Sequence, residues 1–172
     1  MVLKAFLNSE ENGILSFGGA RMALLDIEAG FWGLRRQMEA LVGRQLTDNA
    51  LQQAGANAGA SFARAFVPQV GTEGGESAFH ACVAAYQAAG FGQFEVEMLE
   101  WPPGRMRITG HNTIEAWMIR QHEPQTKQMV CVYTAGVLVG FVNALTGRQD
   151  IICSEQSCQA LGADRCLFEL LP

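Results

Sequence analysis

The sequence predicts an α+β fold, in which a mainly antiparallel sheet packs with long helices. Three observations support this. Apolar residues recur at helical spacing in the first half of the chain, they alternate with a period of two after residue 93, and an apolar segment of helical length precedes a final pair of short strands. The order of helices, hairpin, helix and strands differs from the regular alternation of a βαβ fold. We expect residues 1–18 to form an N-terminal arm and residues 19–172 to form a single domain.

The first predicted helix covers residues 19–42. Apolar residues recur along it at intervals of three and four, at Leu24, Ile27, Phe31, Leu34, Met38 and Leu41. Such a stripe most often faces the core of its own domain, but its spacing also suits the seam of a helical dimer. We predict a homodimer through these six residues.

Two further helices and a hairpin follow. Thr47 or Asp48 is a suitable cap for a helix that we expect to end at Pro68, and the next helix, about residues 76–89, ends at Gly90. Period-two alternation at 94–98 and 106–108, around the turn 102–104, predicts a β-hairpin. We expect its acidic and basic residues to face each other across its solvent side.

The C-terminal third begins with a weaker strand prediction at residues 114–119. A helix over 129–145 follows, and Gly136 and Gly140 on one of its faces predict tight packing against another element. Gly147 is the expected end of this helix. Residues 150–153 and 166–171 are expected to form a final strand pair.

Composition and charge restrict the function. The net charge is −5 and Lys and Arg form no cluster, which argues against direct nucleic-acid binding. The longest apolar run, residues 129–142, is too short to span a bilayer, and the N-terminus lacks the pattern of a secretory signal. We therefore expect a cytoplasmic protein, whose cysteines are free thiols or metal ligands and not a disulfide framework.

Three of the five cysteines, Cys153, Cys158 and Cys166, lie within fourteen residues. Glu155 and Cys158 are three residues apart, so both side chains can reach one ion, and Cys166 can return to it if the segment between them doubles back at Gly162. Cys131 is a candidate remote fourth ligand. Spacing alone leaves three alternatives open, namely a metal site, buried structural thiols, and a redox pair or disulfide.

The C-terminal part resembles the 4-vinyl reductase domain family, through Cys131, Gly136, Gly140 and Gly147-Arg148, followed by Glu155-x-x-Cys158-x-x-x-Gly162-x-x-x-Cys166. Similarity extends upstream through Arg21, Leu34-Arg35-Arg36, Gly55 and Gly59, and Asn112-Thr113-Ile114-Glu115-Ala116, and it is loose over residues 70–110. The family is related to the N-terminal sensor domains of phenol- and xylene-responsive bacterial activators and to trafficking-complex subunits.

The resemblance implies a domain that encloses a small hydrophobic molecule, dimerises through a long helix and holds a structural zinc ion. By motif, the ligands carry over to Cys131, Glu155, Cys158 and Cys166. The additional thiol of Cys153 is an alternative to Glu155. Cys82 has no partner in the motif, and we expect it in the core.

No catalytic motif is recognisable, and a zinc ion with four protein ligands leaves no open position for a reacting water, so we lean away from an enzyme. In the aromatic-sensing relatives, a histidine and a tryptophan bind a phenolic ligand. The candidate pocket residues here are His80, Trp117, Phe79 and Tyr86, although ordinary core packing explains them equally well.

The leading hypothesis is a sensory module for an aromatic or other hydrophobic ligand, which signals to a separate effector protein or belongs to a longer chain. The alternatives are an accessory protein or enzyme of tetrapyrrole metabolism, after which the family is named, and a non-enzymatic interaction scaffold.

Overall fold

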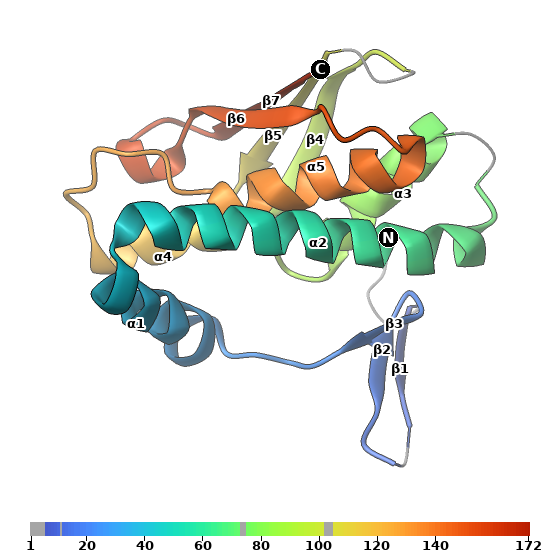
Figure 1. Ribbon diagram of the computed structural model, residues 1–172, viewed down its shortest axis with the longest axis horizontal. Helices are drawn as coiled ribbons and strands as arrows, with labels where there is room; N and C mark the ends of the chain where they lie inside the picture. The colour runs from blue at the N-terminus through green and yellow to red at the C-terminus, as the bar shows by residue number, and fades with distance from the viewer. Residues whose placement is uncertain (1–5, 11, 73–74, 102–104) are drawn as a thin grey trace.

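The computed structural model describes residues 6–10, 12–72, 75–101 and 105–172, which form helices and two antiparallel sheets (Figure 1). The small sheet contains β1 (Leu7–Ser9), β2 (Leu15–Phe17) and β3 (Ala20–Met22), in sequence order. The larger sheet has the order β4-β5-β7-β6 and contains β4 (Gln93–Leu99), β5 (Met106–His111), β6 (Ile152–Ser157) and β7 (Cys166–Leu171). The predicted α+β class with antiparallel strands is confirmed.

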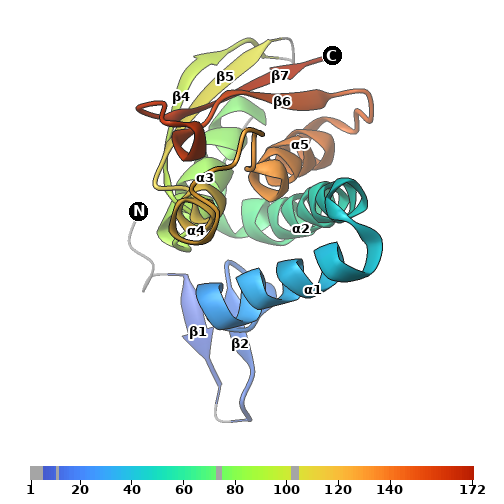
Figure 2. The same cartoon turned by 90° about the vertical axis from the view of Figure 1, so that its left-hand side faces the viewer.

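The helices lie on one side of the larger sheet. Figure 2 shows this sheet at one end of the molecule, α3 and α5 beneath it, and α1 beside the small sheet at the other end. A π-helical turn, Ile27–Trp32, leads into the first of the α-helices, which are α1 (Gly33–Val42), α2 (Arg44–Val70), α3 (Gly75–Ala88), α4 (Ile114–His122) and α5 (Val132–Thr146). Within the described part of the chain, no helix is long and apolar enough to cross a membrane.

Helices α2 and α5 pack backbone against backbone, which confirms the close approach predicted from Gly136 and Gly140. A Cβ atom on Gly140 would lie 2.2 Å from the carbonyl oxygen of Ala56, and one on Gly136 would lie 2.1 Å from that of Gln52. The contact is reciprocal, because Cβ atoms on Gly55 and Gly59 would each lie 2.3 Å from a carbonyl oxygen of α5. Only glycine allows this separation of the two helices.

The first helix begins later than predicted, because residues 20–22 belong to β3. The chain reverses at Gly18 and Gly19, whose φ angles of 54° and 78° are accessible to glycine, and Ala20 then pairs with Phe17. The helical segment starts at Ile27, where the Asp26 side chain caps it by accepting a hydrogen bond from the Ala29 N–H.

Pro68 does not end the second helix, which continues to Val70 and stops at Gly71 in the left-handed conformation. Pro68 lies in the last turn, so its missing N–H removes one hydrogen bond without breaking the helix beyond it. The third helix ends near Gly90 and the last at Gly147, as predicted, and both glycines have positive φ.

The predicted strand at 114–119 is wrong, since these residues start α4. The hydroxyl of Thr113 accepts a hydrogen bond from the Ala116 N–H, so it caps the helix, and Ile114 and Met118 are buried one turn apart. A short apolar run suits either a strand or a helix, and the capping residue selected the helix.

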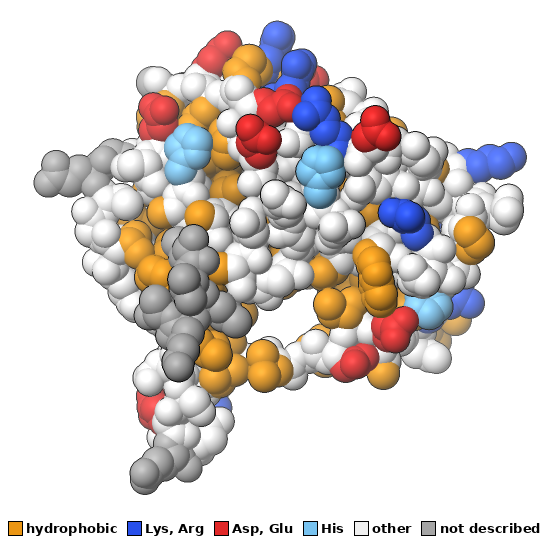
Figure 3. Space-filling view, turned by 180° about the vertical axis from the view of Figure 1, so that it is seen from behind, with side chains coloured by type: hydrophobic (Ala, Val, Ile, Leu, Met, Phe, Trp, Pro, Cys, Tyr) orange, Lys and Arg blue, Asp and Glu red, His pale blue; other side chains and the backbone are white. Residues whose placement is uncertain are grey.

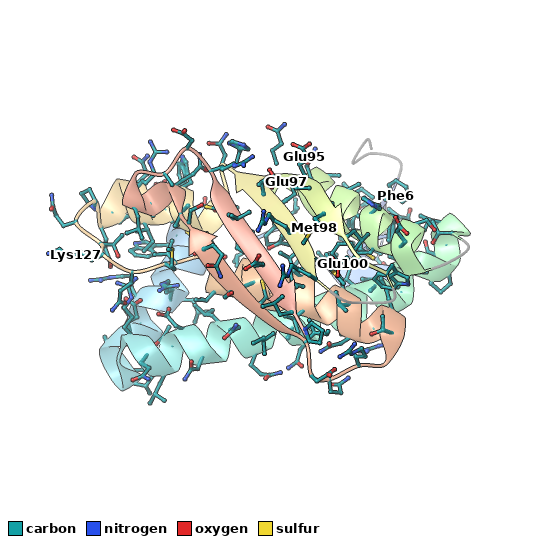
Figure 4. The ribbon with its side chains drawn as sticks, turned by 90° about the horizontal axis from the view of Figure 1, so that it is seen from above. Phe6, Glu95, Glu97, Met98, Glu100 and Lys127 are labelled. Atoms are coloured by element: carbon teal, nitrogen blue, oxygen red, sulfur yellow. The ribbon has the colours of Figure 1, made fainter. Side chains whose placement is uncertain are left out.

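The hairpin is confirmed by the antiparallel pairing of β4 with β5, although its predicted turn, 102–104, lies outside the described residues. Its charge pairing was predicted wrongly. A bulge between Val96 and Met98 places Met98 opposite Arg107 in the strand register. Arg107 forms its ion pair with Glu169 of β7, at 3.1 Å, and not with a glutamate of β4. Glu97, which lies on β4 with Glu95 (Figure 4), pairs with Arg165.

The final strand pair is confirmed, with β6 longer than expected, and Glu155 therefore lies on a strand. The proposed boundary between the N-terminal arm and the domain falls at Gly18 and Gly19, in the turn between β2 and β3, and stays a prediction.

Candidate functional site

The four candidate metal ligands lie together. Cys131 precedes the first turn of α5, Glu155 lies on β6, Cys158 follows that strand and Cys166 begins β7. A ligand atom from each of these side chains lies within 4.8 Å of all the others. A short 3₁₀ turn, Gln159–Leu161, and the left-handed Gly162 reverse the chain between the last two cysteines. The cluster therefore joins the start of α5 to the β6–β7 hairpin.

The donor set fits a tetrahedral metal ion. The Sγ atom of Cys166 lies 3.7 Å from that of Cys131 and 3.9 Å from that of Cys158. Zinc–sulfur bonds of about 2.3 Å in a tetrahedron place neighbouring sulfur atoms about 3.8 Å apart. A disulfide would require about 2.05 Å, and all five cysteines are free.

Glu155 has an oxygen atom available to such an ion. Its Oε2 accepts hydrogen bonds from the N–H groups of Val130 and Cys131, both at 3.0 Å, which fixes the carboxylate at the start of α5. Its Oε1 is buried and has no hydrogen-bond partner. A buried carboxylate oxygen without a partner is costly, and a bound cation would remove that cost.

The clustered thiols differ in acidity. Hydrogen bonds from Cys131 and Cys158 lower the pKa of Cys166 to about 5, whereas burial raises the pKa of Cys131 well above its ordinary value. Burial also raises the pKa of Glu155 to about 7. Because thiolates and carboxylates are the metal-binding forms, loading of the site would release protons.

The remaining cysteines lie outside this group. Cys153 is buried on β6 but is not one of the four clustered residues, and Cys82 is fully buried in the core, as expected. Thr113 was missed from the sequence. Its Oγ1 lies 3.2 Å from Cys131 Sγ and 3.7 Å from Cys166 Sγ, so the residue that caps α4 also contacts the cluster.

A cavity of about 210 Å³ opens between the small sheet and three helices. Its wall is mainly aromatic and aliphatic, and its residues come from the second hairpin of the small sheet, α2, the end of α3 and α5. Its aromatic members are Phe17, Phe62, Tyr86, Phe91, Tyr133 and Phe141. Tyr86 stacks on Phe91 with ring centroids 4.2 Å apart, and Phe17 stacks on Phe62 at 5.7 Å. The geometry suits a flat apolar molecule.

Of the four pocket residues predicted from the sequence, Tyr86 lines this cavity and the other three do not. Phe79 is buried beside Trp101, the His80 side chain is exposed, and Trp117 on α4 is 40% exposed. Phe79 lies on the same buried face of α3 as Tyr86 but two turns before it, where it packs beside Trp101, and His80 lies on the exposed side of the helix.

A buried polar chain leads away from Tyr86. Its hydroxyl lies 3.2 Å from Thr134 Oγ1, and the N–H groups of Tyr133 and Thr134 donate to the two carboxylate oxygens of Glu115 at 2.8 and 2.9 Å. Glu115 is fully buried, and burial raises its pKa to about 7. Two carboxylates, Glu115 and Glu155, therefore satisfy N–H groups at the start of α5.

The six residues of the predicted dimer seam separate into two sets. Leu24, Leu34 and Leu41 are 88%, 57% and 82% exposed, whereas Ile27, Phe31 and Met38 are partly buried. Phe31 packs edge-on against Tyr133 at 5.7 Å. The π-helical turn adds residues per turn and so shifts the stripe between residues 27 and 33.

Comparisons with known proteins support the sequence resemblance. Residues 3–101 match the family model described as activator of aromatic catabolism, and residues 111–172 match the family model of the 4-vinyl reductase domain. A search of curated proteins found no match.

Two solved structures share the fold. The phenol-responsive sensory domain of the transcription activator PoxR, in a crystal structure with phenol, matches with a TM-score of 0.89 at 19% identity, over 99% of this chain and 86% of that one. A trafficking protein particle complex subunit 3 from Naegleria fowleri, covalently bound to palmitic acid, matches with a TM-score of 0.62 at 15% identity, over 82% of this chain and 89% of that one.

Proposed function

Since this chain belongs to the family of activators of aromatic catabolism, we propose that it is a sensory module that encloses a small aromatic molecule. The observation that carries the proposal is the aromatic-walled cavity of about 210 Å³. An apolar cavity of about 150 Å³ accommodates benzene, so this one suits a single substituted ring. A tetrapyrrole has four linked rings and needs much more room, which is why we favour a sensor over a role in tetrapyrrole metabolism.

The ligand would act on the helices that form the cavity wall. Val137 and Phe141 of α5 line it together with Phe62 of α2, and these two helices touch through their backbones. A ligand that fits one arrangement of α2 and α5 better than another shifts the population toward it. The start of α2 adjoins α1, so such a shift would reach the exposed leucines of α1.

We propose that these exposed leucines belong to a homodimer interface. Leu34 and Leu41 lie one heptad apart on α1, and Leu46 follows on α2 with 58% of its side chain exposed. Exposed apolar residues that cluster in this way mark association surfaces. Figure 3 shows that hydrophobic side chains also border the hollow between the rest of the molecule and the segment that joins the small sheet to α1.

We further propose that Cys131, Glu155, Cys158 and Cys166 hold a structural zinc ion. The sulfur spacing and the unpaired Glu155 oxygen support it. All four positions of a tetrahedral ion would be taken by the protein, so the ion would fasten α5 to the β6–β7 hairpin and leave no site for a reacting water. This supports a binding module over an enzyme.

Ligand binding is tested by filling the cavity. Ala85 is a fully buried residue of its wall, and Ala85→Leu would place three more carbon atoms in the space that the ligand needs. The protein should bind phenol in isothermal titration calorimetry and the variant should not, whereas Ala54→Leu on the exposed face of α2 should bind as wild type does. If wild type binds no phenol, toluene or other single-ring aromatic compound, the proposed function is wrong.

The metal is tested by elemental analysis of protein purified without a metal-affinity tag. We expect about one zinc ion per chain and five reduced thiols in denaturant. Cys153→Ala should keep the zinc and Glu155→Gln should weaken its retention, because Cys153 lies outside the cluster. If Cys153→Ala loses the zinc ion and Glu155→Gln retains it, Cys153 is the fourth ligand in place of Glu155.

A further inference from the structure

The first turn of α5 belongs to both candidate sites. Cys131, which directly precedes this turn, is one of the clustered metal ligands. Tyr133 lines the aromatic cavity, where its ring stacks on Phe91 with centroids 6.1 Å apart. Thr134 is buried, and its Oγ1 lies 3.2 Å from the hydroxyl of Tyr86, a second residue of the cavity wall. This turn therefore joins the metal cluster to the cavity.

Two carboxylates fix this turn. Glu155 of β6 accepts two hydrogen bonds from N–H groups that directly precede the helix, and Glu115 of α4 accepts two from the first turn itself, all at 2.8–3.0 Å. A helix leaves its first N–H groups without partners of its own, so these carboxylates supply the missing acceptors. Glu155 is also one of the four candidate metal ligands. The same side chain therefore belongs to the cap of α5 and to the metal cluster.

The first turn of α5 is the part of the helix most easily disordered, because helix ends open more readily than helix interiors. A metal ion can bind all four of its candidate ligands only when Cys131 and Glu155 are held together at this turn. A ring in the cavity can contact Tyr133 only when the same turn is formed. Each ligand therefore favours the ordered turn, and whichever binds first reduces the loss of conformational entropy that opposes the other.

We infer that the metal ion and the aromatic ligand bind cooperatively, with the first turn of α5 as the element that both stabilise. The inference rests on the proposed function and adds a regulation to it, because the supply of zinc would then set the affinity of the sensor for its ligand. Thr134 is the positioning residue, since its N–H donates to Glu115 while its hydroxyl contacts that of Tyr86. Coupling free energies are reciprocal, so each ligand raises the affinity for the other by the same factor.

Zinc and phenol are the probes that measure this coupling. Zinc-loaded protein is equilibrated with a coloured chelator in the absence and in the presence of saturating phenol, and the absorbance of the chelator gives the zinc affinity. Phenol should raise that affinity at least about fivefold, the lower end of common coupling factors. Phenol should also slow amide hydrogen exchange at the start of α5 in the zinc-loaded protein. Calorimetric titration of phenol into zinc-loaded and zinc-depleted protein should return the same factor.

Variants assign the coupling to the contact between Thr134 and Tyr86. Thr134→Val keeps the shape and the backbone N–H of the residue, and its coupling factor should be about fivefold smaller, which is the effect of one net hydrogen bond. Thr134→Ser keeps the hydroxyl and should restore the factor, whereas Tyr86→Phe, which removes the other hydroxyl of the pair, should lower it as Thr134→Val does. The matched control is Thr146→Val in the last turn of α5, whose hydroxyl donates to the Val142 carbonyl and contacts neither site. It should couple as wild type does.

The results that would overturn the inference differ in what else they overturn. Phenol binding that leaves the zinc affinity unchanged, or a wild-type factor in Thr134→Val and Tyr86→Phe, refutes the coupling through this turn and leaves the aromatic sensor. Protein that neither contains nor takes up zinc refutes the metal site and the coupling, and again leaves the sensor. No binding of phenol or another single-ring aromatic compound by the zinc-loaded protein refutes the sensor, and the coupling with it.

Discussion

Replacement of Gly140 by alanine should destabilise the protein through the contact between α5 and α2. The new Cβ atom would lie 2.2 Å from the Ala56 carbonyl oxygen and 2.7 Å from the Ala60 nitrogen. Both are backbone atoms, so no side-chain rotation can relieve the overlap. An ordinary contact of about 3.4 Å requires the helices to separate locally by about 1 Å, which weakens dispersion contacts along the interface.

The cost follows from two opposing effects. Overpacking of a core costs about 1–3 kcal/mol, and the better helix propensity of alanine returns up to about 1 kcal/mol. We expect a net loss of about 2 kcal/mol, because the overlap is with rigid backbone. For a chain of this length, that loss lowers the melting temperature by about 4–8 °C.

Thermal and urea unfolding, followed by circular dichroism, measure this loss. The matched control is Gly33→Ala, since Gly33 has a helical φ of −57° and no heavy atom within 4 Å of an added Cβ. It should be neutral or stabilising by up to about 1 kcal/mol. If Gly140→Ala melts at or above the wild-type temperature, the backbone contact of α2 with α5 is not as close as described.

Three further variants test other parts of the molecule. Cys158→Ser should lose the metal and several kcal/mol of stability, about 3 or more, whereas Cys82→Ser should keep wild-type metal content by elemental analysis. The pKa of Glu115, raised by burial from 4.5 to about 7, contributes stability that is full below pH 4.5 and is lost as the pH rises through 7. The stability of wild type relative to Glu115→Gln, measured by urea unfolding, should therefore fall by on the order of 3 kcal/mol between pH 4.5 and pH 8, and a constant difference would contradict this. Leu41→Glu should sediment as a folded monomer at micromolar concentration and Leu161→Glu as a dimer, and a dimeric Leu41→Glu would exclude the α1 interface.

Local patterns in the sequence predicted much of the fold. The alternation around β4 and β5 identified a hairpin, because a period of two specifies a strand without reference to the rest of the chain. Gly136 and Gly140 predicted a close helix contact, although not that Gly55 and Gly59 of α2 form the other side. The pattern failed at residues 114–119, where a run of this length is compatible with both periods.

The candidate site was also predicted only in part, since local spacing identified the cysteine cluster but not the cavity. The spacing of Glu155, Cys158 and Cys166 predicted the cluster because these residues share one hairpin. Cys131 was a candidate remote ligand, and the family resemblance supported all four. Of the pocket residues predicted from the sequence, Tyr86 lines the aromatic cavity, and Trp117 and His80 do not. Its wall combines residues from the small sheet, α2, α3 and α5, and no sequence period relates positions so far apart.

By itself, the sequence determined the α+β class, most of the helices and strands, and the residues that cluster at the start of α5. These depend on side-chain periodicity, on capping residues and on motif spacing, all of which act over a few residues. The tertiary structure alone decided that residues of the small sheet, α2, α3 and α5 enclose an aromatic cavity and that Tyr86 connects this cavity through Thr134 to Glu115. Those contacts join segments separated by tens of residues, and their geometry exists only once α2 and α5 have packed together.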